Sequence, residues 1–293
     1  GGKYMQFYIS ILTFTLISVI AVTGIYVLTG LTGMFSLGQA AFMAIGAYVS
    51  GYLVVKLGVP FVLAAIIAVI ISVMVGYIVG LPTVRLRRDY ISLVTLGFGE
   101  AITALLNQAQ SITGGALGFS GIPKITTLPL ALISAIACIV LISFLKNSKY
   151  GRQCIAARSD ELAAKTMGIN VPQIKMIAFL ISVAVTSYAG VLYAFFTTYV
   201  DPGIFGWKKS AEWVIMVFFG GVNSLTGSII GTVILTALPE VLRFAADYRT
   251  VFYAVLVLII INFKPTGLFG EYELSLVNLL KRLSGKKEER ANA

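Results

Sequence analysis

Long apolar runs without charge dominate this sequence, and they constrain the fold more than any other feature. The first run, Phe7–Leu28, contains no charged residue. A bilayer core of about 30 Å is crossed by roughly 20 residues of α-helix, so this run can span it. It is too long for a cleaved signal peptide and lacks an obvious small-residue cleavage site. Only 12% of the residues are charged, whereas a soluble domain is about one quarter charged. The sequence therefore predicts an integral membrane protein.

Further apolar runs predict an all-α, polytopic helical bundle. Five more spans are expected at Gly38–Val55, Pro60–Leu81, Tyr90–Leu106, Leu128–Leu145 and Met176–Val200. After them the signal breaks into the shorter runs Trp213–Val222, Ser228–Leu238 and Val251–Phe263, the first two separated by glycines. These form either three closely packed spans or a re-entrant pair followed by one full span. The total is about eight to ten transmembrane helices, some broken. Residues 1–270 would form one transmembrane domain, and residues 271–293 a basic tail.

Basic residues gather in three segments that predict the orientation of the chain. Arg85–Asp89 is a compact cluster, residues 146–175 carry six Lys or Arg, and more follow Lys264 in the tail. Cytoplasmic loops of membrane proteins are enriched in Lys and Arg. All three segments are therefore expected in the cytoplasm, with the N-terminus outside. A net charge of +10 gathered in loops is typical of membrane topology and does not indicate nucleic-acid binding.

Tyr150–Lys175 is the longest polar interruption of the apolar sequence, and it predicts one short helix. Ser159 is placed to cap its start. Asp160 and Glu161 would lie in the first turn, where negative charge suits the helix dipole. Glu161 can pair with Lys165 across one turn. The helix therefore has its own start signals.

The same helix also has stop signals and an apolar patch. Gly168 supplies a left-handed stop, and Pro172 prevents the helix from continuing. The patch between these ends consists of Leu162, Ala163, Thr166 and Met167. So short a helix is marginal alone, because helix nucleation is costly. It either packs in the groove of a partner or lies as a capped loop along the membrane surface, and the residues themselves leave both open.

Glu100 is the charged residue inside the predicted span Tyr90–Leu106. A carboxylate in a membrane helix costs roughly 3 kcal/mol on insertion scales, so it should face protein or water. It lines a polar pathway, or pairs with a neighbouring Arg or Tyr, or lies near the membrane interface. The following segment, Asn107–Thr127, is expected outside. Trp207 and Trp213 are expected in an interfacial aromatic belt.

Several kinds of chemistry are missing from the sequence. It has no histidine, no Walker motif and no Rossmann fingerprint. Its two cysteines, Cys138 and Cys154, lie in an apolar span and in the polar stretch, which predicts neither a disulfide nor a metal site. Few carboxylates lie in the spans, so acid–base catalysis is not expected. The protein is therefore expected to be no enzyme and to bind no cofactor itself.

A series of motifs between about residues 30 and 270 resembles the permeases of branched-chain amino-acid ABC transporters, and within them the LivM type. In chain order they are Ser36–Phe42, Gly46–Tyr48, Thr95–Glu100, Thr113–Gly115, Gly121–Pro123, Gly151–Arg152, Ala156–Arg158, Asp160–Ala164, Met167–Asn170, Gly220–Gly221, Leu238–Glu240 and Lys264–Leu268. One departure is Ala116–Phe119, where the family would have an Asn-Gly type turn. The resemblance implies an ABC-importer permease architecture.

The resemblance also implies that residues 146–175 dock on an ATPase. Glu161, Ala163, Ala164 and Gly168 match the Glu-Ala-Ala…Gly loop of ABC permeases, with Leu162 intervening. The docking residues that it implies are Arg158, Asp160, Glu161, Leu162, Ala163, Ala164, Met167 and Gly168. In this interpretation Glu161 and Arg158 anchor the helix, and Leu162 and Met167 fill the partner's groove.

The family's partners and substrates follow from the same resemblance. A second, homologous permease, two cytoplasmic ATPase subunits that bind ATP and an extracytoplasmic binding protein are implied, in the inner (plasma) membrane. The implied substrates are branched-chain amino acids, with urea, amides or another small polar solute as an alternative. An ATP-independent secondary transporter and a structural membrane subunit are the rival functions. Candidate pathway residues are Gly97, Glu100, Thr113, Gly114 and Gly115.

Overall fold

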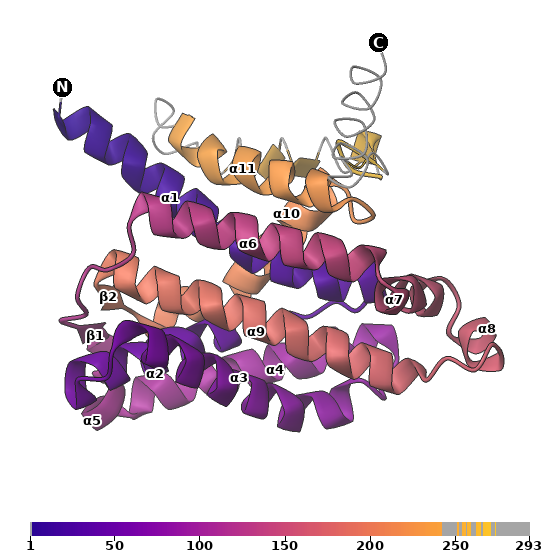
Figure 1. Ribbon diagram of the computed structural model, residues 1–293, viewed down its shortest axis with the longest axis horizontal. Coiled ribbons are helices and arrows are strands. Elements are labelled where there is room, and N and C mark those ends of the chain that lie inside the picture. The colour runs from indigo at the N-terminus through magenta and orange to yellow at the C-terminus, as the bar shows by residue number, and fades with distance from the viewer. Residues whose placement is uncertain are drawn as a thin grey trace, which may run out of the picture.

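The computed structural model describes residues 2–241 and, between 251 and 273, residues 251, 254–255, 257–258, 262–264, 266–270 and 273. Long helices lie side by side in it, and a short helical arm projects from one end (Figure 1). The long helices are α1 (Gly2–Tyr26), α2 (Gln39–Leu57), α3 (Phe61–Thr83), α4 (Arg88–Gln108), α6 (Leu128–Asn147) and α9 (Val171–Thr197). The arm consists of α7 (Lys149–Ser159) and α8 (Glu161–Thr166). The predicted all-α class is confirmed.

Six helices of the described residues are long and apolar enough to cross a membrane, and they correspond to the six long predicted runs. α10 (Trp207–Gly220) and α11 (Leu225–Val241) form a further pair that is bent by 120° at a short break. The bend agrees with the re-entrant alternative and argues against separate, straight spans. If this pair is counted as one span, the described residues contain seven candidate membrane spans. The last predicted run, Val251–Phe263, lies mostly outside the described residues.

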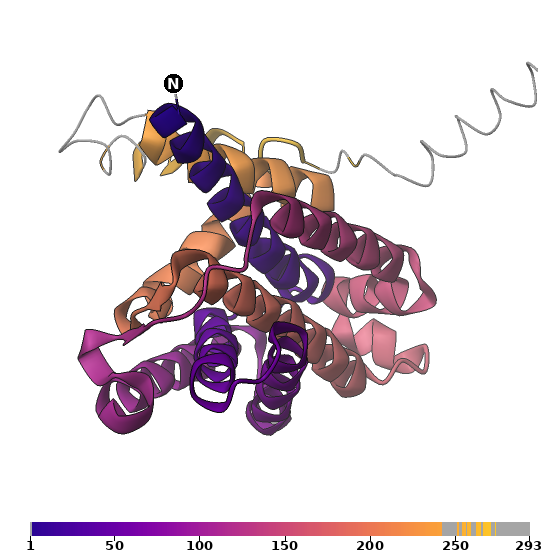
Figure 2. The same cartoon turned by 60° about the vertical axis from the view of Figure 1, so that its left-hand side comes forward.

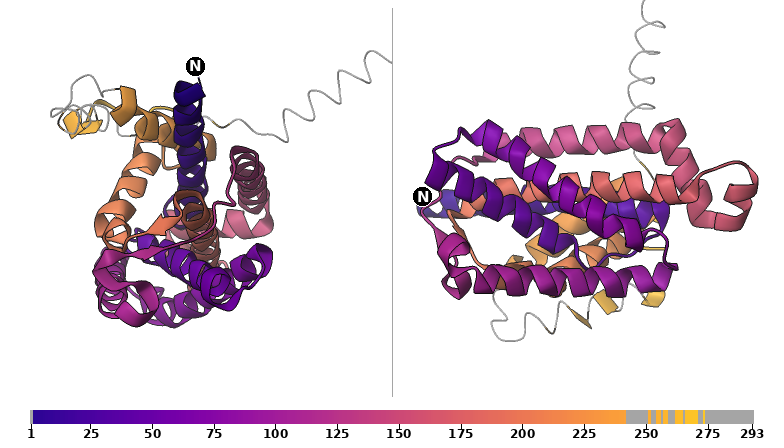
Figure 3. Two further views of the ribbon diagram at one scale, coloured as in Figure 1. Left: turned by 90° about the vertical axis from the view of Figure 1, so that its left-hand side faces the viewer. Right: turned by 90° about the horizontal axis from the view of Figure 1, so that it is seen from below.

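α1 and α9 form the centre of the bundle, and α3, α4 and α6 lie outside them. In the membrane-length windows, 78% of α1 and 67% of α9 is buried, against 17% of α4. The end-on view in Figure 3 shows α1, in indigo, running into the middle of the bundle. The backbones of α2 and α9 approach closely, because a Cβ at Gly190 would lie 2.0 Å from the Met43 carbonyl oxygen. Small residues permit such contacts between membrane helices.

The opposite end of the bundle from the arm is closed by short elements, and we call it the strand end. They are α5 (Gln110–Thr113), η2 (Gly115–Leu117), β1 (Phe119–Ser120), β2 (Tyr199–Val200) and η3 (Pro202–Phe205). β1 and β2 pair antiparallel, with Phe119 opposite Val200. This pairing ties the predicted external loop to the end of α9. Figure 2 shows α11, the upper orange helix, against α1.

Candidate docking arm and substrate pathway

The arm is two helices, and the prediction of a single helix capped by Ser159 was wrong. Ser159 is the last residue of α7, and its hydroxyl donates to the carbonyl oxygen of Ile155 at 3.1 Å. Asp160 caps α8 instead, because its backbone is extended and its Oδ1 accepts from two amides. These are the N–H groups of Leu162 at 2.8 Å and Ala163 at 3.0 Å. A carboxylate also suits the positive end of the helix better than a hydroxyl does.

The predicted stop at Gly168 is confirmed. Its φ is +79°, in the left-handed region, and a Cβ there would meet nothing within 4 Å. The amide of Ile169 donates to the Ala164 carbonyl at 3.1 Å and closes the end of α8. Pro172 then lies in the first turn of α9, for which Asn170 is the N-cap. A proline is tolerated there because the first amides of a helix have no partner within it.

Glu161 pairs with Lys175 of α9, and the predicted pair with Lys165 is not formed. The tertiary contact prevails because α8 folds back on the start of α9, where Lys175 is only 3% exposed. Ala164 packs beside it in a small core with Ala157 and Val171. Glu161 and Ala164 therefore hold α8 against the bundle, so the arm does not depend on the intrinsic stability of a six-residue helix.

The remaining face of α8 is exposed and apolar. Leu162 is 75% exposed and Met167 is 82% exposed. Ala163 and Thr166 are exposed beside them, so all four residues of the predicted patch lie on one surface. Leu162 and Met167 thus form an apolar patch that no described residue of this chain covers.

Two basic residues at the base of the arm bond to irregular parts of the bundle. Arg158 donates to the carbonyl oxygen of Gly30, which lies in η1 (Val27–Leu31), a π-helical turn at the end of α1. The structure thus places Arg158 at the base of the arm, away from the exposed face of α8. Lys146 at the end of α6 pairs with Glu273 and donates to the carbonyl oxygen of Asn223 at 3.1 Å. Asn223 lies in the bend between α10 and α11.

Burial makes the arm's cysteine unreactive. Cys154 of α7 is only 1% exposed, and its burial raises the pKa of the thiol to about 12. A neutral thiol is neither a nucleophile nor a metal ligand. In the described part of the chain no group of His, Cys, Asp or Glu could hold a metal ion.

Glu100 lies on the exposed face of α4. It is eight residues from the end of the helix, or roughly 12 Å at 1.5 Å per residue, so it is well inside the span. It forms no ion pair with a described residue, and its Oε1 accepts from the amide of Trp207 at 3.4 Å. Gly97 is on the same face, and a Cβ there would meet nothing within 4 Å. This face therefore has room beside a carboxylate that lipid does not solvate.

The other three candidate pathway residues lie elsewhere. Thr113, Gly114 and Gly115 form a tight turn at the strand end of α4. The Thr113 hydroxyl donates to the Leu106 carbonyl at 2.6 Å and accepts from the Gly115 amide at 3.2 Å. Gly114 has a φ of +77°, and a Cβ there would lie 2.1 Å from the carbonyl oxygen of Gly118, so both the backbone conformation and the space require glycine. The structure does not bring this turn together with Glu100, and its hydrogen bonds indicate a structural role.

A junction of α2, α4 and α10 contains polar residues that were not predicted. α2 begins beside the middle of α4, because Leu37 donates its amide to Thr95 at 3.1 Å and Gly38 lies against Gly99. The amide of Ala40 donates to Ser210 of α10 at 2.9 Å. The available signal in the sequence for this junction was Gln39, a polar residue at the start of the apolar run Gly38–Val55.

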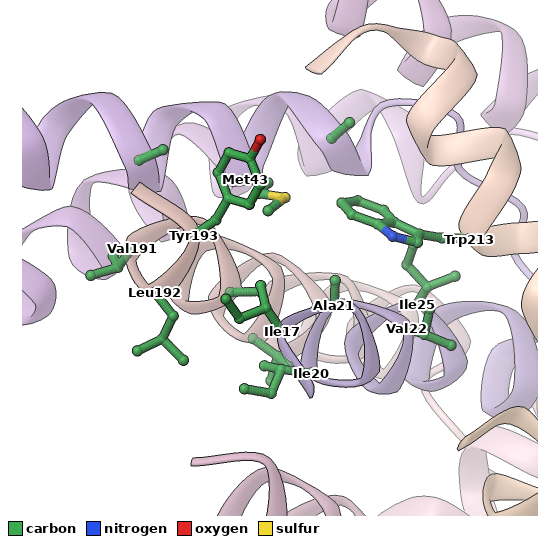
Figure 4. Close-up of a cluster of buried hydrophobic side chains, with 14 of the residues drawn as sticks. Ile17, Ile20, Ala21, Val22, Ile25, Met43, Val191, Leu192, Tyr193 and Trp213 are labelled. Carbon is green, nitrogen blue, oxygen red and sulfur yellow. The ribbon is translucent and has the colours of Figure 1, made fainter. Parts of the chain in front are cut away.

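Two buried side chains near this junction have no hydrogen-bond partner among the described residues. Gln39 is fully buried, and neither the nitrogen nor the oxygen of its side-chain amide has a partner there. Nε1 of Trp213 is likewise buried without a partner. The expected interfacial position of Trp213 was wrong, because its indole is 1% exposed. Figure 4 shows the indole in a cluster with Met43, Tyr193 and side chains of α1. The aromatic ring is used for packing between α1, α2 and α10.

Comparisons with known proteins agree with the motifs. The family model described as "Branched-chain amino acid transport system / permease component" matches residues 7–262. The permease protein LivM of Salmonella typhimurium is 32% identical over 89% of this chain and 69% of its own length. A probable LivM of Methanocaldococcus jannaschii is 28% identical over 88% of this chain and 83% of its own. LivH of Salmonella typhimurium is 30% identical over 65% of this chain and 62% of its own.

Among solved structures, PsaBC from Streptococcus pneumoniae in complex with Fab aligns with 86% of this chain and 89% of its own, at 19% identity and a TM-score of 0.49. The family match and the LivM relatives cover most of the chain, including the arm and the bent pair. This chain therefore belongs to the family of branched-chain amino acid transport permeases.

Proposed function

We propose that this chain is a permease subunit of an ATP-driven importer of branched-chain amino acids. A second, homologous permease, two cytoplasmic ATPases and an extracytoplasmic binding protein would complete the transporter in the plasma membrane. The exposed apolar face of α8 carries this proposal. Its Leu162 and Met167 are more than 70% exposed, whereas Ala164 of the same helix is buried in the small core with Val171 of α9.

The docking surface suits a groove on an ATPase. α8 is capped by Asp160 and stopped at Gly168, so it presents Leu162 and Met167 in one fixed orientation. An amphipathic helix that lays its apolar face in a groove is a common recognition mode. The arm and the basic cluster Arg85–Asp89 are separated by two long helices, α4 and α6, so they lie on the same side of the membrane. Positive charge favours the cytoplasmic side for both, where ATPases would bind.

The arm's internal bonds give ATP binding a route into the bundle. A partner can shift a conformational equilibrium only through contacts that differ between two states. A displaced α8 pulls on α7, and α7 is bonded to the π-helical turn η1 through Arg158. The adjacent end of α6 is bonded to the α10–α11 bend through Lys146. Both targets are irregular segments, in which hinges are commonly found.

The substrate side of the proposal rests on the relatives and on the exposed face of α4. The relatives are named as branched-chain amino acid permeases. Gly97 and Glu100 offer space and one carboxylate in an otherwise apolar span, which suits a conduit for a small zwitterion. We place the pathway beside Glu100, between α4 and α10, whose Trp207 amide donates to the Glu100 carboxylate.

Gly168→Val tests the docking role, with Gly58→Val as the matched control. Both glycines end a helix at positive φ, +79° and +65°, and both have open space around the missing Cβ. A left-handed β-branched residue costs about 1–2 kcal/mol at either site. We expect only Gly168→Val to lower amino-acid uptake per ATP hydrolysed in proteoliposomes. Equal effects of the two variants would refute the docking role, and uptake without any ATPase would show a secondary transporter.

A further inference from the structure

We infer that the junction of α2, α4 and α10 holds a substrate zwitterion in transit, with its carboxylate at the start of α2 and its ammonium group at Glu100. This inference rests on the proposed function and names the chemistry of its pathway. The residues that carry it are Gln39, Ala40, Glu100, Ser210 and Trp213.

The start of α2 is a suitable site for a carboxylate. α2 has 19 residues, and its N-cap, Gly38, provides no side-chain hydrogen bond. The positive end of its dipole therefore lies inside the bundle, beside Thr95 and Gly99 of α4. Helices that begin within the membrane point this end at anionic groups of substrates. In this structure the amide of Ala40 donates to the Ser210 hydroxyl, which a carboxylate oxygen can replace.

Two unpartnered buried groups supply further donors for the same carboxylate. Gln39 is the first residue of α2, and side chains in a helix lean toward its N-terminus, so its amide lies at this end. Both atoms of that amide lack a partner at 0% exposure. Trp213 lies one turn along α10 from Ser210, and its Nε1–H also lacks a partner. Unpaired buried donors are costly, which points to a group that binds them in another state of the protein.

The carboxylate of Glu100 is placed for the ammonium group. It accepts from the amide of Trp207, three residues before Ser210 on α10. Three residues of helix rise roughly 4.5 Å, so the α10 residues that contact Glu100 and the start of α2 lie about one turn apart along α10. An α-amino acid with a hydrogen bond of about 3 Å at each of its two charged groups reaches over such a separation. Lys209, with its Nζ 5.8 Å from the centroid of the Trp213 ring, adds positive potential on the carboxylate side although it pairs with Glu212.

The junction is closed in this structure. A cavity beside it, lined by Met43, Lys209 and Trp213 among others, has a volume of about 40 Å³. That volume holds a water molecule and is too small for an amino acid. The site therefore has to open for a substrate to enter, and a movement of α10 away from α2 would open it. α10 ends at the bend that bonds to Lys146, and Lys146 lies at the end of α6 next to the arm. A displacement of the arm by the ATPases can therefore move α10.

The test uses the complete transporter in proteoliposomes, with L-leucine delivered by its binding protein. Gln39→Met removes the amide and keeps the side-chain volume. Trp213→Phe removes the Nε1–H and also leaves a smaller ring in the core, so Gln39→Met is the decisive variant. Ser182→Ala is the control, because its buried hydroxyl on α9 is also unpartnered. We expect the first two variants to lower ATP-dependent uptake at least tenfold, with assembly and basal ATP hydrolysis unchanged, and the control to stay within twofold of wild type.

A second measurement does not depend on any variant. A leucine analogue with a diazirine in its side chain is irradiated during ATP turnover by the wild-type transporter. We expect adducts in the peptides that contain Met43 and Trp213. If the wild-type transporter takes up leucine while these peptides stay unlabelled, the inference is overturned and the proposed function stands. Full uptake by Gln39→Met would have the same meaning. Wild-type transport that needs no ATPase would instead overturn the proposed function.

Discussion

Asp160→Ala removes the residue that starts α8, and its consequence can be worked from the contacts. The Asp160 carboxylate accepts from two amides, at 2.8 and 3.0 Å, that have no other partner in a helix start. Replacing an N-cap by alanine costs about 1 kcal/mol, within a range of about 0.5–2. At 25 °C, 1 kcal/mol is about a fivefold change in the ratio of formed to unformed α8. If the partner binds only the formed helix, its apparent affinity falls by up to this factor, and by less the more completely α8 is formed.

The assay is a titration of purified ATPase subunits against permease in detergent or nanodiscs. We expect an increase in Kd of up to about fivefold for Asp160→Ala. Asp160→Asn should bind like wild type, because asparagine caps helices as well as aspartate does. Ser159→Ala should also bind like wild type, because its hydroxyl only donates within α7. If Ser159→Ala weakened binding as much as Asp160→Ala, the cap assignment would be wrong. If none of the variants changed Kd, α8 would not be the docking helix.

Three further predictions concern other residues. Glu100→Gln should slow amino-acid uptake at least tenfold and leave ATPase binding unchanged, and an equal loss of both would indicate a folding role. Glu161→Ala leaves the buried Lys175 without its partner and should lower the stability of the arm by about 1–3 kcal/mol, seen as faster proteolysis of the arm. Adding Lys175→Met should restore the protease resistance, and no recovery would argue against the pair. Burial raises the pKa of Cys154 to about 12, so its thiolate fraction at pH 8 is on the order of 10⁻⁴. Iodoacetamide should therefore label Cys154 only after unfolding. Rapid labelling of this residue in the native protein would contradict its burial.

The helical class and the positions of the long spans were predictable because the bilayer acts on each segment separately. Any run of about 20 apolar residues must form a helix to satisfy its backbone within lipid, whatever its neighbours are. For this reason the runs beginning at Phe7 and Leu128 appear in the structure close to their predicted bounds. The stop at Gly168 was equally predictable, because a left-handed turn is a property of one residue.

The tertiary structure decided which charged residues pair and how deeply individual side chains are buried. Glu161 has Lys165 four residues away, yet it pairs with Lys175, because α8 folds back on α9 and the buried lysine needs a counter-charge. Trp213 looked interfacial from its distance to the span ends, but the packing of α10 on α1 and α2 buries it. The polar Gln39 is the local sequence signal at the start of α2, but it does not place that start inside the bundle. That position arises where Gly38 meets α4 and Ser210 meets Ala40, and such contacts between distant segments exist only in the folded bundle.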